Sequence, residues 1–237
     1  MAMRRVLLLS VALVTLAISA GWAISINPAI DYKVVAGNQS YTGALGMAFQ
    51  VNTPIVVNGL GVFDSGGDGL SREIYVEIRQ LTSLPSGNVS SPVNLAGSAV
   101  ASATFLTTGS YPLIGGARWQ QISETVIGVG NWMIIARGYG PGEQNYNAGG
   151  GSNSNHVNAV DTFGGAITWG IGPYLGNAYG SGSLPDTWDY HLGGGPVIRY
   201  GAGTFSVVPE PSTYALMGTV GLALYLLRRR KAKATKA

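Results

Sequence analysis

The residues best suited to binding a ligand in this sequence are two aspartates, Asp64 and Asp68, in the glycine-rich segment 64–69. Carboxylates separated by flexible residues, with main-chain carbonyls free to turn inward, provide the oxygen ligands that Ca²⁺ prefers. The same residues also suit a tight turn in which Asp side chains accept hydrogen bonds from main-chain N–H groups. The sequence therefore predicts either a Ca²⁺ site or a capped turn at this position.

A second candidate site is formed by aromatic residues in the Gly-, Asn- and Ser-rich stretch 138–195. Aromatic rings beside polar side chains are typical of sugar-binding faces, because a ring covers the apolar face of a pyranose while polar groups bond its hydroxyls. Alternatively, the rings pack beneath long loops and replace a core that glycine cannot supply. The predicted glycan-binding residues are Tyr146, Trp169, Tyr174, Tyr179, Trp188 and Tyr190.

Catalytic motifs are absent from the sequence. Its two histidines, His156 and His191, lie in Gly- and Asn-rich segments, and no nucleophile elbow, zinc-binding His-Glu-x-x-His or phosphate loop occurs. Glu73 and Glu77 fall on one face of a predicted strand about 13 Å apart, beyond the roughly 5–10 Å used by glycosidase pairs. We expect a protein without catalytic activity, and a polysaccharide hydrolase built from distant acids is the alternative.

The elements that must position these residues are β-strands. Residues 74–79 alternate between apolar and polar side chains, as a strand with one solvated face does. Clusters of Gly, Asn, Ser and Pro separate the predicted strands. Gly130-Asn131, between two of these strands, is predicted to form a hairpin turn, and no core segment has the pattern of a long amphipathic helix. The expected fold is all-β, an antiparallel, jelly-roll-like β-sandwich. Further runs rich in β-branched and aromatic residues are 55–63, 98–105, 119–127, 132–137 and 196–205, with weaker candidates at 32–36, 47–51 and 166–169.

The charge distribution argues against a nucleic-acid partner. Residues 24–208 contain six basic and ten acidic residues, a net charge of −4, so the overall charge of +3 comes from the two ends of the chain. A domain of this sign lacks the basic surface that nucleic-acid binding requires. The chain has no cysteine, so a folded domain of about 185 residues must be stabilised by its core rather than by disulfides.

The N-terminal residues have the pattern of a secretory signal peptide. Arg4 and Arg5 precede an apolar run over residues 6–18, and small residues follow at the usual cleavage spacing. We expect a signal helix within residues 1–23 with cleavage after Ala23, and a folded domain over residues 24–207.

The C-terminal residues combine a rigid motif, an apolar run and a basic cluster. The apolar run from Tyr214 to Leu227 would reach about 21 Å as a helix, less than the roughly 30 Å of a hydrocarbon core. Basic residues after it would remain on the cytoplasmic side of the membrane. Residues 208–237 are therefore expected to form a sorting tail with a short transmembrane helix, and an ordinary tail anchor is the alternative. The motif consists of Pro209, Glu210 and Pro211, and the basic stop consists of Arg228, Arg229, Arg230 and Lys231.

These features resemble the PEP-CTERM sorting signal of exopolysaccharide-producing Gram-negative bacteria. The resemblance rests on the segment from Pro209 to Thr213, the run from Gly218 to Leu227 and the arginine cluster. It implies that exosortase, a membrane cysteine protease or transpeptidase, removes the tail, so that this chain is the substrate. It further implies transient anchoring in the inner membrane before arrival at the cell surface or outside the cell.

Part of the domain also resembles an uncharacterised β-sandwich family that is common in PEP-CTERM proteins. This resemblance rests on residues 60–70 and 95–105, on Arg118-Trp119 and on the hairpin 125–136. It implies a jelly-roll-like fold of unassigned function. The two resemblances predict a cell-envelope or matrix protein associated with exopolysaccharide or biofilm, and a carbohydrate-binding module using the loop aromatics is the alternative.

Overall fold

Nearly all regular structure in the described part of this chain is β-structure. The computed structural model describes residues 26–84, 93–147, 157–170, 173–175, 187–188, 190–192 and 200–208. Within these ranges the only helices are two 3-10 turns, η1 (Ser65–Gly67) and η2 (Phe163–Gly165). The predicted all-β fold is thereby confirmed, while the predicted signal helix and C-terminal transmembrane helix lie outside the described residues. None of the described helices is long and apolar enough to cross a membrane.

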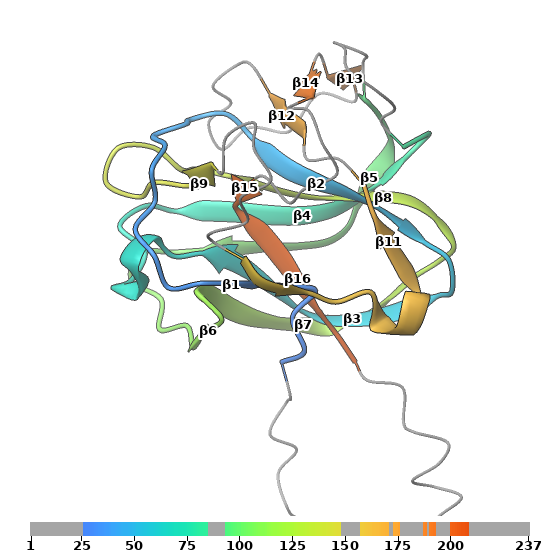
Figure 1. Ribbon diagram of the computed structural model, residues 1–237, viewed down its shortest axis with the longest axis horizontal. Helices are drawn as coiled ribbons and strands as arrows, with labels where there is room; N and C mark the ends of the chain where they lie inside the picture. Colours follow the sequence, from blue (N-terminus) through green and yellow to red (C-terminus); the bar gives the residue numbers. More distant parts are fainter. Residues whose placement is uncertain are drawn as a thin grey trace, which may run out of the picture.

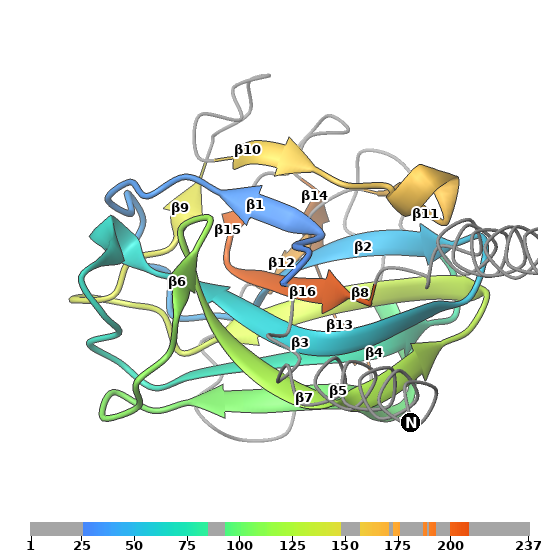
Figure 2. The ribbon, with the colours of Figure 1, turned by 90° about the horizontal axis from the view of Figure 1, so that it is seen from below.

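Two antiparallel sheets lie across the core from each other (Figure 1). The larger sheet contains β2 (Leu45–Val51), β4 (Ile74–Leu81), β5 (Val93–Phe105), β8 (Gly130–Arg137), β11 (Ile167–Trp169), β12 (Pro173–Leu175), β13 (Thr187–Trp188) and β14 (Tyr190–Leu192). Its order is β13-β5-β4-β8-β2-β12-β14, and β11 also pairs with β2. The smaller sheet contains β3 (Ile55–Phe63), β6 (Leu113–Ile114), β7 (Ala117–Ile127) and β16 (Gly203–Val207), in the order β16-β3-β7-β6 (Figure 2).

Two short strand pairs complete the described structure. Strand β1 (Ile30–Tyr32) pairs with β10 (Val157–Val160), and β9 (Tyr146–Asn147) pairs with β15 (Tyr200–Gly201). Each strong predicted run contains or overlaps a strand, and the weaker runs overlap β1, β2 and β11. The predicted hairpin turn at Gly130-Asn131 is wrong, because both residues belong to β8 and the strands β7 and β8 lie in different sheets, so that Gly128 and Val129 connect the two layers. The finer assignment as a jelly roll, and the predicted domain boundaries, stay predictions.

The core is built from the inward faces of the two sheets. On β4 the alternation found in the sequence places Ile74, Val76 and Ile78 in the main apolar cluster. The rings of Phe49 on β2 and Phe205 on β16 lie 5.0 Å apart between centroids, and both side chains are fully buried. Because these two strands belong to different sheets, this aromatic contact joins the two layers.

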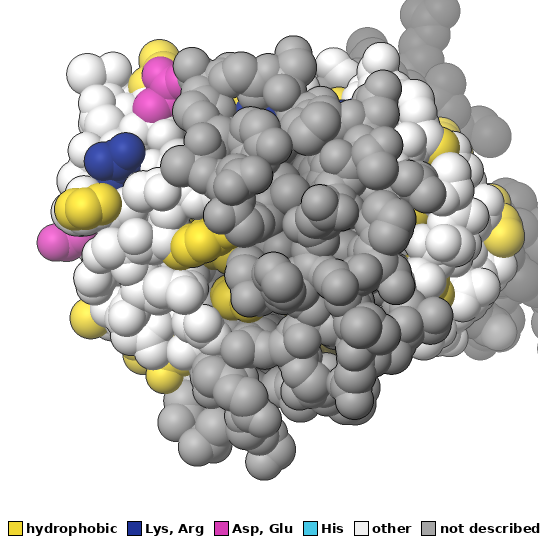
Figure 3. Space-filling view, turned by 90° about the horizontal axis from the view of Figure 1, so that it is seen from above, with side chains coloured by type: hydrophobic (Ala, Val, Ile, Leu, Met, Phe, Trp, Pro, Cys, Tyr) yellow, Lys and Arg dark blue, Asp and Glu magenta, His cyan; other side chains and the backbone are white. Residues whose placement is uncertain are grey.

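The larger sheet also carries a small apolar cluster on its outer face. Strands β13 and β14 are separated by one residue in the chain, yet they lie at opposite ends of the hydrogen-bonded order. The two edges of the sheet must therefore approach each other over the outer face, at the top of Figure 1. From above, the described surface is mostly uncharged, and charged side chains gather toward one edge (Figure 3). The outer cluster consists of Ala44, Ala48, Leu81, Leu95, Met133 and Ile135.

The contact between the two layers predicts the effect of truncating its ring. Changing Phe205→Ala should lower the free energy of unfolding by about 3–5 kcal/mol, because it leaves a cavity between the sheets. Val126→Ala is the control, since Val126 is 68% exposed and its truncation should change stability by less than about 0.5 kcal/mol. Urea unfolding followed by tryptophan fluorescence measures both effects. Equal losses in the two variants would contradict the proposed role of Phe205.

Candidate functional site

The chain leaves the folded domain directly from β16. The Val207 N–H donates to the Asn27 carbonyl at 3.2 Å, and the Val208 N–H donates to the Val56 carbonyl at 2.8 Å. Val208 is the last residue described, so the predicted sorting motif begins one residue after the last observed sheet bond. The described N-terminal residues lie at the same end, because Pro28 forms an isolated β-bridge with Ser206.

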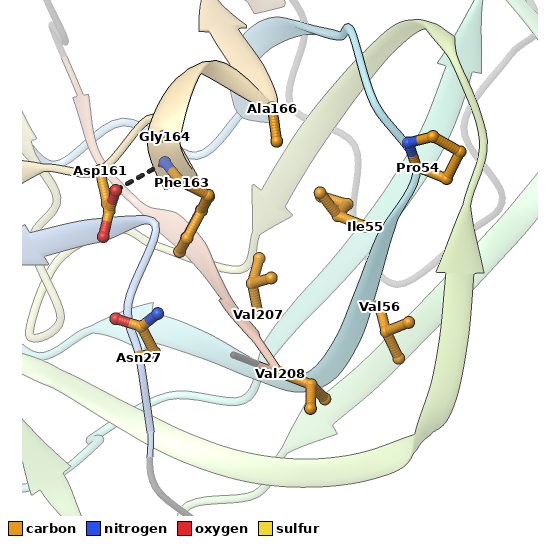
Figure 4. Close-up of a pocket in the computed structure, with 10 residues that line it drawn as sticks. All are labelled: Asn27, Pro54, Ile55, Val56, Asp161, Phe163, Gly164, Ala166, Val207 and Val208. Carbon is orange, nitrogen blue, oxygen red and sulfur yellow. Dashed lines mark hydrogen bonds between the residues drawn. The ribbon is translucent and has the colours of Figure 1, made fainter. Parts of the chain in front are cut away.

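An apolar pocket of about 470 Å³ lies beside this exit (Figure 4). Ile55, Phe163 and Val207 contribute apolar side chains to its lining, and Asn27 and Asp161 contribute the polar ones. The Asp161 carboxylate accepts the Phe163 main-chain N–H at 2.6 Å, so it holds the η2 turn in place. The pocket therefore forms an apolar recess at the base of the tail.

The two predicted calcium ligands, Asp64 and Asp68, differ in burial. Asp64 is fully buried, and its Oδ2 accepts hydrogen bonds from Arg118 Nε at 2.6 Å and from the Gly69 N–H at 3.1 Å. Asp68, by contrast, is exposed. Because Arg118 already neutralises the Asp64 carboxylate, the geometry favours the capped turn over the calcium site, which stays a prediction. Among the described residues, no group of three or more His, Cys, Asp or Glu side chains is arranged to hold a metal ion.

A second buried acid, Glu143, was missed by sequence reasoning. It is 1% exposed, its Oε1 accepts the Ser65 N–H at 3.1 Å, and its Oε2 accepts the Ser71 N–H at 2.8 Å. Burial raises the pKa of the Glu143 carboxyl, and the charge of Asp64 raises it further, against the two N–H donors. The carboxylate thus fixes both ends of the loop 65–71, which follows Asp64 and contains Asp68. Nothing in its local sequence distinguishes it from a solvated loop acid.

Of the predicted glycan-binding aromatics, Trp169 is the best defined. It is partly buried, with its ring centroid 5.5 Å from that of Phe49 and 6.0 Å from that of Phe205. Its Nε1–H donates to the Asp161 carbonyl at 3.0 Å. Trp169 therefore extends the aromatic contact between the two sheets, which favours the packing alternative at this position.

The other predicted aromatics are only partly described. Tyr146 is partly buried and packs against the main apolar cluster, which also fits the packing alternative. The main chain places Tyr174 on β12, Trp188 on β13 and Tyr190 on β14, all of which are strands of the larger sheet. Tyr179 lies outside the described residues. For these four residues glycan binding stays a prediction.

A recess with several polar and charged side chains lies where β4 begins and β8 ends. Two pockets of about 600 and 380 Å³ both have Ser71 and Thr107 in their linings, so they adjoin. We call the pair the polar groove. Its hydroxyl, carboxylate and guanidinium groups are of the kinds that bind sugars and their substituents. Side chains that line it include Asp68, Ser71, Arg72, Glu73, Tyr75, Thr107, Tyr111, Arg118 and Arg137.

Comparison with known proteins identifies the segment that follows β16. A family profile described as the PEP-CTERM protein-sorting motif matches residues 207–231. The chain carries a PEP-CTERM sorting motif. The match starts at Val207, the last residue of β16, and includes the predicted motif, apolar run and basic stop, so the first resemblance is confirmed. No curated protein and no solved structure is significantly similar to the chain.

The PEP-CTERM motif implies export, transient anchoring and processing by exosortase before sorting to the surface. Its residues Pro209, Glu210 and Pro211 and the basic stop after them lie outside the described residues. The match does not extend into the folded domain, whose resemblance to a β-sandwich family stays a prediction.

The sorting motif and the polar groove belong to opposite ends of the domain. Strand β8 starts at Gly130, which pairs with Val51 near the chain exit, and ends at Arg137 in the groove. Its eight residues span about 26 Å at roughly 3.3 Å per residue. The groove therefore lies about 25 Å from the end of the domain to which the PEP-CTERM tail is attached.

Removing the buried carboxylate should destabilise the fold. Asp64→Ala leaves Arg118 and the Gly69 N–H without their acceptor, and we expect a loss of about 3 kcal/mol. Asp68→Ala, in the same loop but exposed, is the matched control and should change stability by less than about 0.5 kcal/mol. Urea unfolding measures both variants, and a larger loss in the Asp68 variant would contradict the assignment.

The capped turn also predicts that the protein is insensitive to Ca²⁺. A metal ion that binds only the folded state raises the melting temperature. The Asp64 Oδ1 has no hydrogen-bond partner, but the carboxylate is buried and its charge is already paired with Arg118. We expect the melting temperature of the wild type to be the same in saturating CaCl₂ and in EDTA. A rise with Ca²⁺ that disappears in Asp68→Ala would establish the calcium site instead.

Proposed function

We propose that this chain is an exported cell-envelope or matrix protein that exosortase processes and whose folded domain associates with exopolysaccharide, without catalytic activity of its own. The observation that carries the proposal is the PEP-CTERM motif directly after the last sheet bond, at the opposite end of the domain from the polar groove. A domain attached in this way holds its groove away from the membrane.

The length of the connection supports this orientation. Five residues, 209–213, separate Val208 from the start of the predicted apolar run at Tyr214. Even fully extended they reach only about 18 Å, and the two prolines favour an extended chain. Before processing, the exit end of the domain is therefore held close to the membrane, and exosortase must act in this narrow gap.

The surroundings of three buried acids support a role without catalysis. Asp64 and Glu143 are buried and hold loops through main-chain N–H groups. Glu77 is 5% exposed, and its Oε2 accepts a hydrogen bond from the Tyr75 hydroxyl at 3.1 Å. Each of these carboxylates stabilises local structure, whereas a glycosidase requires a pair of acids that face a substrate.

Removing the sorting motif should prevent processing by exosortase. Changing Pro209-Glu210-Pro211 to three alanines should leave export intact but trap the full-length protein in the inner membrane, because exosortase no longer recognises it. Cell fractionation and intact mass, in strains with and without exosortase, measure the effect. A control that changes Thr235, outside the matched residues 207–231, to alanine should still be processed. If the triple variant were trimmed and reached the surface in an exosortase-containing strain, the tail would be an ordinary anchor.

Association with exopolysaccharide predicts where the mature protein is found. It should co-fractionate with the polymer from the producing strain and shift to the soluble extracellular fraction in a strain that makes no exopolysaccharide. An unchanged distribution in the two strains would contradict the proposed association and leave the sorting route unaffected.

A further inference from the structure

Arg137 is an unusual residue in the polar groove because its charge is buried. It is the last residue of β8, its side chain is 7% exposed, and it lines the smaller pocket of the groove. Its guanidinium carbon lies 4.3 Å from the centroid of the Tyr75 ring, which faces it across the strand pair. Among the residues that the structure describes, neither its Nε nor its Nη1 has a hydrogen-bond partner.

A buried guanidinium with two unpaired nitrogens destabilises the fold unless a ligand, ion or water accepts its hydrogen bonds. A buried charge without hydrogen-bond partners is costly, and a cation–π contact offsets only part of that cost. Buried polar groups that lack partners in a protein are commonly satisfied by a ligand, ion or water. The geometry therefore calls for a hydrogen-bond acceptor, preferably an anionic one, in the pocket at Arg137.

The charges around Arg137 favour an anion. Arg72 lines the same pocket, and its Nε donates to the Gly138 carbonyl at 2.8 Å, which orients the guanidinium. Glu73 is the one acid in the lining of this pocket, and it is exposed. Glu77, two residues from Tyr75 on β4, is a buried acid whose Oε2 accepts the Tyr75 hydroxyl, and it does not line this pocket. The lining of this pocket thus has two cations against one solvated carboxylate.

The groove also concentrates the few basic residues of an acidic domain. Of the six basic residues in 24–208, Arg72, Arg118 and Arg137 line the two adjoining pockets. Because the domain carries a net charge of −4, a general attraction for polyanions is not expected, and an anionic group would be recognised only locally. Ser71, Thr107 and the Tyr75 side chain add hydroxyls for neutral groups of the same ligand.

We propose that the pocket at Arg137 binds the carboxylate of an acidic sugar, a uronate unit within a polysaccharide. The pocket volume of about 380 Å³ is at the lower end of small-ligand sites, which suits one sugar unit. Arg137 and Arg72 bond the carboxylate, and the groove hydroxyls bond the sugar hydroxyls. This inference rests on the proposed association with exopolysaccharide and names the chemical group that the groove recognises.

Binding of defined polymers by the full-length chain in detergent tests the inference. Polygalacturonate supplies carboxylates, dextran supplies neutral sugar and dextran sulfate supplies sulfates. We expect polygalacturonate to raise the melting temperature and to bind at least tenfold more tightly than dextran or dextran sulfate. Arg137→Met, which keeps the apolar stem, should weaken polygalacturonate binding at least tenfold, because it removes charge-assisted hydrogen bonds.

Two further variants keep the test decisive. Arg72→Gln changes an exposed residue that should not affect folding, and it should weaken binding severalfold. Lys33→Gln removes one positive charge outside both pockets and should leave binding unchanged. Without polymer, Arg137→Met should melt no lower than the wild type, because the substitution removes a buried guanidinium whose Nε and Nη1 have no hydrogen-bond partner.

Several results would overturn the inference. They are equal binding of the neutral and acidic polymers, tighter binding of dextran sulfate, equal weakening by Lys33→Gln, or no effect of both arginine variants. A wild type that binds none of the polymers would overturn it as well. If Arg137→Met co-fractionates with native exopolysaccharide as the wild type does, this inference fails while the proposed function stands. If polygalacturonate binding depends on Arg137 but the wild type ignores native exopolysaccharide, the proposed function fails while the site stands.

Discussion

The pairing of β16 with β3 is the interaction on which the rest of the structure depends. Strand β16 closes the smaller sheet, places Phe205 against Phe49 of the opposite sheet, and bonds the first described residues through Asn27 and Ala29. Within this strand the Thr204 hydroxyl accepts the Ile30 N–H at 3.0 Å and donates to the Ile30 carbonyl at 3.1 Å. These contacts unite the N-terminal residues, the two sheets and the attachment point of the tail.

The strands could be predicted from the sequence because apolar and polar side chains alternate along them. The predicted solvated face of residues 74–79 was wrong, however, since Glu77 and Arg79 are buried on β4 as well. Alternation along residues 74–79 and the β-branched run at 55–63 gave β4 and β3 nearly to the residue. The hairpin predicted between β7 and β8 was wrong, because Gly130 lies within the ladder opposite Val51 and the two strands belong to different sheets. A glycine does not reveal in sequence whether it bends a chain or extends it.

The buried charges could not be predicted, because their roles depend on contacts between residues far apart in the chain. Asp64 meets Arg118 and Glu143 meets Ser65 only after β3, β7 and the loop after β8 come together. Arg137 ends an apolar run and resembles an ordinary residue at a strand terminus. The sorting tail was predictable for the opposite reason, since its proline motif, apolar run and basic stop are contiguous.

The position of β16 in the chain has a consequence for the order of events during biogenesis. Its partners on the N-terminal side, such as Ile30 and Asn27, are more than 170 residues earlier in the sequence. The sandwich cannot close until residues 203–207 are available, and a contact between such distant residues forms slowly because a long loop must close first. Residues 203–207 are followed almost at once by the PEP-CTERM motif. A chain exported N-terminus first would therefore complete its fold only as its sorting signal enters the membrane, so folding and anchoring would occur at nearly the same moment.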